Sequence, residues 1–138
     1  MIFRTQVTFT AAGDRFTPSK MSAPFSHTHD PGDIARRGRL RGKPQPGGHA
    51  SFDAPEEEKE KIAWLHRIVV PLLPALRESG ADEFWLRITY HCSSGALGFS
   101  KEEIRMIAEM ECDVPIDCLI DEELNQAAQI TPGLRPRA

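Results

Sequence analysis

A run of positive charges between residues 36 and 43 is the strongest chemical signal in the sequence. The guanidinium group of arginine can form paired hydrogen bonds with a carboxylate or a phosphate. The run therefore predicts a contact surface for an acidic protein or a nucleic acid, or else an exposed loop whose charge the acidic residues 53–60 balance. Single-stranded nucleic acid is less favoured, because the run holds no aromatic residue on which a base could stack. The basic residues are Arg36, Arg37, Arg39, Arg41 and Lys43.

A second group of side chains has the chemistry of metal ligands. His27, His29, Asp30, Asp33 and His49 carry imidazole and carboxylate groups, which bind zinc or harder cations. Their spacing matches no established metal motif, and neither HExxH nor CxxC occurs in the chain. We therefore expect no metal and no cofactor, and a polar loop exposed to solvent is the favoured interpretation.

Cysteine and carboxylate chemistry gives no catalytic motif. The three cysteines, Cys92, Cys112 and Cys118, cannot all pair, and we expect buried thiols. His91 adjoins Cys92, but neighbouring strand residues point to opposite faces, so no nucleophilic pair is expected. The carboxylates between residues 102 and 117 are interpreted as a helix start and a solvated acidic face. No Walker loop, GxGxxG or GxSxG is present, so the chain is more consistent with a protein that is not an enzyme.

Composition limits the class of protein. The chain has 138 residues, 40% of them hydrophobic, which suits one folded domain. No apolar stretch approaches the ~20 residues of a membrane span. The net charge of −3 excludes a general polycation, but residues 36–43 carry +5, while nine acidic and two basic groups give residues 101–123 a charge of −7. The first fifteen residues lack a signal-peptide pattern, and with the odd cysteine count this predicts a cytoplasmic protein with no membrane association.

Alternation of apolar and polar residues predicts the strands. Thr17 followed by Pro18 predicts a short capped helix. Residues 26–48 are rich in Gly and Pro and predict a long loop, with room for one hairpin strand. The expected strands cover residues 2–10, 48–53, 83–92 and 114–120.

Two longer segments have helical patterns. Residues 55–79 carry apolar side chains every three or four positions, with a kink or a break expected near Val70 because Pro71 and Pro74 follow it. A turn over residues 93–98 leads to the second helix. That helix begins with a capping box formed by Ser100 and Glu103. Its expected buried face consists of Ile104, Ile107 and Ala108.

These elements predict an α+β fold, in which a mostly antiparallel sheet carries helices packed on one face. Residues 1–120 are expected to form a single domain, and residues 121–138 a partly disordered C-terminal tail. The segments 7–21 and 87–104 share the order strand, polar loop and capped helix. This repetition predicts pseudo-duplicated strand–helix–strand units.

The order of local motifs also carries a family resemblance. FTPSKM, a basic Gly/Pro-rich loop, HASFD, a long helix, RITY, LGFSKEEIRMIAEM and VPIDCLI follow one another. This order resembles the bacterial domain-of-unknown-function family four-two-seven-nine over roughly residues 2–120. The resemblance implies a small α/β domain without established activity, some of whose relatives resemble immunity or inhibitor proteins encoded beside toxins. The chain departs from it at Phe52, where such domains often have Trp.

The function expected from these observations is a non-catalytic protein-binding module of immunity or inhibitor type, with an acidic protein as its partner. A nucleic-acid-binding accessory protein that uses the same basic loop is the first alternative. A metal-dependent hydrolase that uses His27, His29, Asp30 and His49 is the less favoured one. The residues expected to contact the partner are Arg36, Arg37, Arg39, Arg41 and Lys43.

Overall fold

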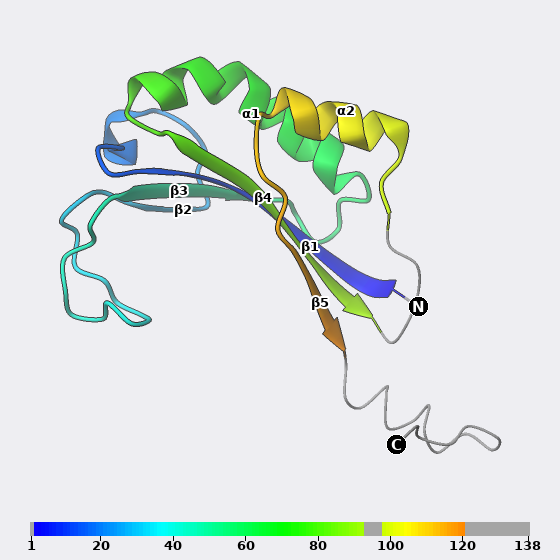
Figure 1. The fold of residues 1–138 in the computed structure, drawn as a ribbon, viewed down its shortest axis with the longest axis horizontal. Helices are drawn as coiled ribbons and strands as arrows, with labels where there is room; N and C mark the ends of the chain where they lie inside the picture. Colours follow the sequence, from blue (N-terminus) through cyan, green and yellow to red (C-terminus); the bar gives the residue numbers. More distant parts are fainter. Residues whose placement is uncertain (1, 93–97, 121–138) are drawn as a thin grey trace.

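Five strands form one sheet in the order β2-β3-β1-β4-β5 in the computed structural model (Figure 1). The structure describes residues 2–92 and 98–120, so most of the predicted turn after residue 92 and the predicted C-terminal tail lie outside it. The elements are β1 (Ile2–Gly13), the 3-10 helix η1 (Pro18–Lys20), β2 (His27–His29), β3 (Gly48–Asp53), α1 (Lys61–Glu78), β4 (Glu83–Cys92), α2 (Lys101–Glu109) and β5 (Ile116–Ile120).

Strand β1 lies at the centre of the sheet and pairs along both of its edges. It is antiparallel to β3 and to β4, and β5 adds to β4 in parallel. Val7, Phe9 and Ala11 are buried, whereas Arg4 and Gln6 are exposed, as the alternation of strand side chains requires. The prediction of a mostly antiparallel sheet is confirmed.

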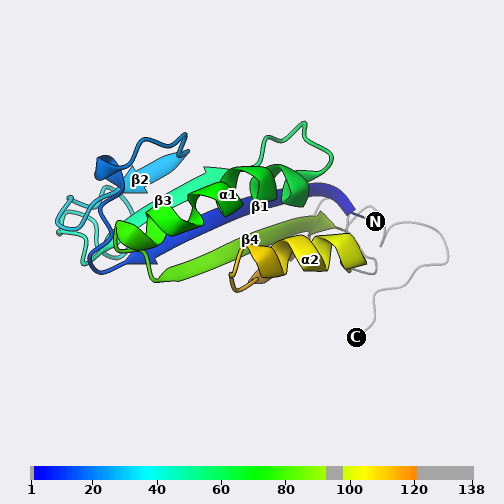
Figure 2. The same cartoon turned by 90° about the horizontal axis from the view of Figure 1, so that it is seen from above.

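Both α-helices cover the same face of this sheet, which confirms the predicted α+β architecture (Figure 2). Leu65 and Val69 of α1 are completely buried with Phe9 of β1 and Leu86 of β4. Burying each such side chain stabilises the fold by roughly 1.5–3 kcal/mol. The opposite face of the sheet carries no α-helix from residues 2–92 and 98–120 and keeps its polar side chains, and we call it the open face.

Of the kink or break expected in α1 near Val70, the break does not occur, because the helix continues through Pro71 and Pro74. Both prolines are exposed. On the solvent side of a helix, water can bind a carbonyl that has lost its intrahelical donor, and curvature relieves the clash with the proline ring. The helix also begins at Lys61 rather than at residue 55.

The capping box that starts α2 is confirmed, whereas the predicted buried face is right only for Ile107, which packs partly buried against the core. The Glu103 amide donates to Ser100 Oγ at 3.1 Å, and the Ser100 amide donates to Glu103 Oε1 at 2.9 Å. Ile104 is 56% exposed, and Ala108 is exposed as well. The buried residues are Met106 and Met110, which lie four positions apart and therefore on one side of the helix. Their flexible side chains pack into the core beside α1.

The predicted pseudo-duplication is not confirmed. The first unit has only a three-residue 3-10 helix, and the strand that pairs beside β1 is antiparallel to it. The second unit has a nine-residue α-helix and a parallel strand pair. Thr17 also makes no capping bond through its side chain, whose hydroxyl lies 3.4 Å from the Arg15 carbonyl instead. The shared pattern of the two segments therefore reflects the local rules of helix starts.

Strand β5 is exposed on both of its faces. Ile116 is 47% exposed and Leu119 is 50% exposed. Among the described residues, this parallel edge strand has no further neighbour and no layer that buries its apolar side chains. No helix in the described part of the chain is long and apolar enough to cross a membrane.

The start of β3 depends on the absence of a side chain at Gly48. A Cβ atom at this position would lie 1.6 Å from the backbone oxygen of Phe16. We expect Gly48→Ala to lower the free energy of unfolding by about 3 kcal/mol, because rigid backbone must move. Urea denaturation measures this change. The control is Gly98→Ala, since nothing lies within 4 Å of its added Cβ, and equal losses in both variants would contradict the clash.

Candidate functional site

Residues 30–47 connect β2 to β3 and form a projecting segment that we call the basic arm (Figure 1). Its two sides are joined by backbone hydrogen bonds. The Ala35 amide donates to the Lys43 carbonyl at 2.9 Å, and the Gly42 amide donates back to the Ala35 carbonyl at 2.8 Å. Nearer the sheet, the Gln45 amide donates to the Asp33 carbonyl at 2.7 Å. The segment predicted as a long loop is therefore a backbone-bonded ribbon.

Two glycines allow the end of the arm to turn. Gly38 has a φ of 76° and Gly42 a φ of 79°, in the left-handed region that side chains disfavour. The Arg41 amide donates to the Gly38 carbonyl at 3.1 Å, which closes the turn between them. Ala35 is buried, so one side of the arm has a fixed packing point. The arm thus holds its basic residues in a defined arrangement.

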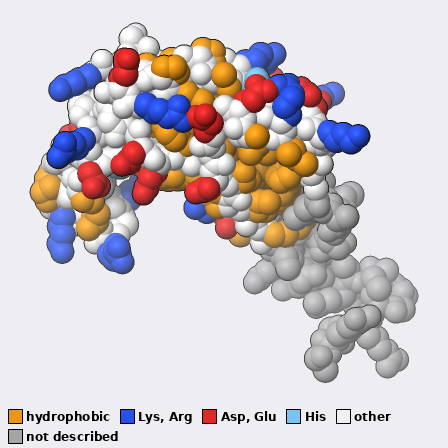
Figure 3. Space-filling model, turned by 45° about the horizontal axis from the view of Figure 1, so that its top comes forward, with side chains coloured by type: hydrophobic (Ala, Val, Ile, Leu, Met, Phe, Trp, Pro, Cys, Tyr) orange, Lys and Arg blue, Asp and Glu red, His pale blue; other side chains and the backbone are white. Residues whose placement is uncertain are grey.

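All five predicted contact residues lie exposed on this arm. Figure 3 shows Lys and Arg side chains gathered on it, at the lower left of that view. None of the five makes an ion pair with a carboxylate of the described residues. They are Arg36, Arg37, Arg39, Arg41 and Lys43.

The acidic residues that were considered as a balance for this charge lie at the other end of the sheet. Strand β3 starts at the base of the arm and runs from Gly48 to Asp53, a length of roughly 17 Å. Residues 54–60 continue beyond that far end (Figure 2). Charges this far apart in solvent are largely screened, because the Debye length is about 8 Å at physiological salt. Residues 53–60 therefore do not neutralise the arm.

A group of aromatic side chains lies on the open face beside the arm. His29 and His49 are paired across β2 and β3, and their rings stack with centroids 5.1 Å apart. Trp85 of β4 approaches the His49 ring edge-on, with centroids 6.2 Å apart. His27 makes an ion pair with Asp53 at 3.2 Å when its imidazole is protonated. The sequence had singled out His27, His29 and His49 as candidate metal ligands, whereas nothing in it pointed to Trp85.

Hollows join the aromatic group to the arm. One, of about 880 Å³, is lined by His27 and His29 from β2 and by Ile34 and Arg36 from the arm. Another, of about 270 Å³, lies between His29, His49 and Leu40. Burial, and after it the nearby positive charges of His29 and His27, lower the pKa of His49. The arm and this corner of the open face therefore form one continuous surface.

The residues considered as metal ligands have other partners. Asp30 Oδ1 accepts from the Ser19 amide at 3.1 Å, and hydrogen bonds from Ser19 lower the pKa of Asp30. Asp33 Oδ2 accepts from the Asp30 amide at 2.8 Å. Within residues 2–92 and 98–120, no three His, Cys, Asp or Glu side chains come together as a set that could hold a metal ion. The structure thus brings the histidines together but directs the carboxylates to backbone amides.

The prediction of three buried thiols is wrong for Cys118, which is exposed on the edge strand β5. Its Sγ atom lies 2.8 Å from Sγ of the buried Cys92 on β4. Cys112 is half-buried, and burial raises the pKa of its thiol to about 11. His91 points to Gln6 instead, at 3.1 Å, so the prediction that His91 and Cys92 form no pair agrees with the geometry.

The carboxylates of α2 are largely occupied by ion pairs rather than only by solvent. Arg105 bridges Glu102 and Glu109, and His66 of α1 lies 3.0 Å from Glu109. A hydrogen bond from Arg105 lowers the pKa of Glu102. Beyond the helix, Arg77 pairs with Glu111. These contacts tie α1 to α2 and leave no converging pair of free acids on this surface of the described chain.

Comparison with known proteins adds no assignment: no family model, curated protein or solved structure matches this chain. The resemblance to family four-two-seven-nine therefore stays a prediction.

The lowered pKa of His49 predicts a pH dependence of stability. The unfolded imidazole titrates near 6.5, and the folded one below it. Unfolding therefore takes up a proton, so this contribution is complete above pH 6.5 and is lost as the pH falls through the folded pKa. We expect the melting temperature to fall between pH 7 and about 5, and to fall less in His49→Asn. Equal slopes in the two proteins would contradict this assignment.

The neighbouring sulfurs predict a selective cross-link. Hydrogen peroxide should oxidise the two thiols of Cys92 and Cys118 to one disulfide, with loss of two hydrogen atoms and release of two water molecules. Mass spectrometry of a non-reduced digest detects this linkage, and dithiothreitol should reverse it. Cys112→Ser should cross-link like the parent chain, whereas Cys118→Ser should not. A linkage through Cys112 would contradict the geometry.

Proposed function

We propose that this chain is a non-catalytic binding module whose basic arm contacts an acidic surface of another protein, as an immunity- or inhibitor-type protein does. The observation that carries the proposal is the arrangement of five cations on a backbone-bonded ribbon, with no carboxylate partner among the described residues. Like charges held close together repel one another, and an acidic partner would relieve that repulsion. Three unpaired cysteines support a reducing cytoplasm as its setting.

The arm combines charge with apolar surface, which favours a protein over a nucleic acid. Ile34 on the arm is 58% exposed, and Leu40 is half-buried between the arginines. Protein interfaces are enriched in arginine and place apolar contacts beside it, whereas a phosphate backbone offers only charge. An acidic protein surface fits both properties.

A nucleic-acid ligand is the second candidate, and one specific observation favours it. The sequence lacks an aromatic residue within the basic run, but the fold places the stacked rings of His29 and His49, with Trp85, next to the arm. Bases of a single strand bind by stacking on such rings while basic residues hold the phosphates. The ligand is then a single strand that crosses the corner of the open face.

Two anionic probes of equal charge separate the candidates. Fluorescence anisotropy would follow a labelled polyglutamate peptide and a labelled single-stranded oligonucleotide at about 50 mM salt. The test variant replaces Arg37, Arg39 and Arg41 with Ser. The control replaces three exposed basic residues away from the arm with Ser and so makes the same change in net charge. They are Lys59, Arg67 and Lys101.

The proposal expects the arm variant to lose at least tenfold in affinity for polyglutamate, and the control to lose less than twofold. An equal loss in both variants would show only a general charge effect and would overturn the role of the arm. Tighter binding of the oligonucleotide, with a further loss in His49→Asn, would replace the acidic protein by a single-stranded nucleic acid. No binding of either probe would reject both candidates.

A further inference from the structure

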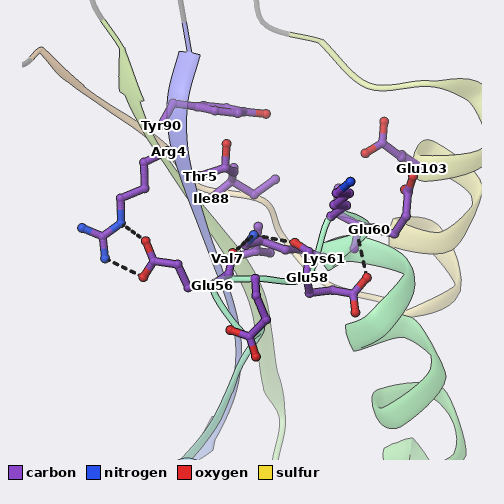
Figure 4. A pocket seen from close by; sticks show the side chains of 13 residues that line it. Arg4, Thr5, Val7, Glu56, Glu58, Glu60, Lys61, Ile88, Tyr90 and Glu103 are labelled. Atoms are coloured by element: carbon purple, nitrogen blue, oxygen red, sulfur yellow. Dashed lines mark hydrogen bonds and ion pairs between the residues drawn. The ribbon is translucent and has the colours of Figure 1, made fainter.

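A separate cavity of about 610 Å³ lies at the end of the sheet opposite the arm (Figure 4). It opens between β1, β4, the segment before α1 and the start of α2. Its apolar floor is formed by Val7, Ile62 and Ile88. Cavities of this size hold small molecules or single side chains in many proteins. None of the residues of the basic arm lines it.

The cavity is acidic. Five glutamates and three basic residues line it, which leaves a charge of −2. Arg4 is already held by both carboxylate oxygens of Glu56, with its Nε 2.6 Å from Oε1. The Lys61 ammonium donates to the carbonyls of Glu56 and Glu58 at 3.0 and 2.6 Å. Two of the three cations are therefore engaged, one by a carboxylate and one by backbone carbonyls, and the lining as a whole keeps its charge of −2.

The strongest sign of a ligand is the phenol of Tyr90. This side chain of β4 is only 8% exposed, yet no described residue forms a hydrogen bond with its hydroxyl. Figure 4 shows the ring reaching from β4 across the cavity toward Glu103 on α2. Burial, and after it the charge of Glu103, raise the pKa of Tyr90, so the phenol stays protonated. The hydroxyl itself is accessible, since none of the described residues has a side-chain nitrogen or oxygen buried without a partner, and it therefore lies open to a ligand in the cavity.

One of the two carboxylate oxygens of Glu103 is available to accept a hydrogen bond from a ligand. Its Oε1 accepts from the Ser100 amide at 2.9 Å in the capping box, while Oε2 has no partner in the described part of the chain. The capping bond fixes the side chain at the edge of the cavity. An aromatic ring beside a carboxylate is a favourable site for a cation, which gains both the charge interaction and the face of the ring.

We propose that this cavity binds a primary ammonium or guanidinium group between Tyr90 and Glu103. The cation donates hydrogen bonds to the free carboxylate oxygen and to the phenol oxygen, and the attached carbon chain lies on the apolar floor. The group can belong to a small free amine or to a basic side chain of a peptide. No residue of the basic arm contributes to this site, so this proposal and the proposed function are tested independently of each other.

Isothermal titration calorimetry of the full chain tests the site with two cationic probes. Agmatine represents a free amine, and acetyl-Gly-Arg-Gly-amide presents the guanidinium within a peptide. Succinate serves as the anionic control. We expect at least one cationic probe to bind with a dissociation constant on the order of 0.1–1 mM at low salt, and succinate not to bind. Whichever probe binds more tightly identifies the source of the cation.

Two variants and a matched control locate the site. Glu103→Gln removes the charge but keeps the capping bond, because glutamine also serves in a capping box. It should weaken binding about tenfold or more, and Tyr90→Phe should weaken it about threefold. Glu78→Gln makes the same chemical change on an exposed residue outside the cavity and should change binding less than twofold.

Three results would overturn the proposal. They are the absence of saturable binding of either cation up to about 10 mM, equal binding of succinate, and equal losses in Glu103→Gln and Glu78→Gln. Should Glu103→Gln fail to fold, Tyr90→Phe decides alone, because it removes one oxygen atom and keeps the buried ring. Unchanged binding in a folded Tyr90→Phe would then reject the site.

Discussion

The pairing of β1 along both of its edges is the constraint on which the rest of the molecule depends. Its antiparallel partners β3 and β4 fix which side chains point toward the helices. Phe9 is completely buried on that side and touches the same core as Leu65 of α1. The register with β3 and β4 simultaneously carries the polar side chains to the open face. One set of backbone hydrogen bonds thus divides β1, β3 and β4 into a core side and a side on the open face.

The helix layer explains why the binding features lie where they do. Both helices cover one face, which leaves the open face, the two ends of the sheet and its exposed edges as the places where a ligand can reach the strands. The arm leaves the sheet at Gly48, where backbone packs directly against the carbonyl of Phe16. The acidic cavity lies at the opposite end, where β3 has given way to the segment before α1. Their separation follows from the length and direction of β3.

Local patterns predicted much of this fold, since period-two alternation and capping chemistry act over a few residues. The strands 48–53 and 83–92 and the capping box at Ser100 agree with the structure. Long-range packing decided the rest. Because of this packing, Met106 rather than Ile104 is the buried residue of α2. For the same reason Ile116 and Leu119 of β5 are exposed, since no second layer of the described residues covers them. A kink and a break at Pro71 and Pro74 could not be distinguished from the sequence, because the exposure of a proline, which decides its cost, is not visible in a local pattern.

The same distinction applies to the candidate sites. The basic run was visible as composition, but its backbone-bonded form and its lack of a described ion-pair partner needed the fold. The aromatic group could not be predicted, because His29, His49 and Trp85 meet only through strand register. The acidic cavity could not be predicted either, because the sequence pattern had already explained Tyr90 as part of a strand and Glu103 as part of a capping box.

Charge is distributed so that the two ends of the molecule can act separately. The arm and the segment before α1 are divided by the length of β3, roughly 17 Å. This is about twice the Debye length at physiological salt, so a ligand at one end changes the potential at the other only weakly. At low salt the two fields overlap, and the net charge of −3 then describes neither end. A small domain with one core can therefore present a cationic and an anionic recognition surface without either neutralising the other.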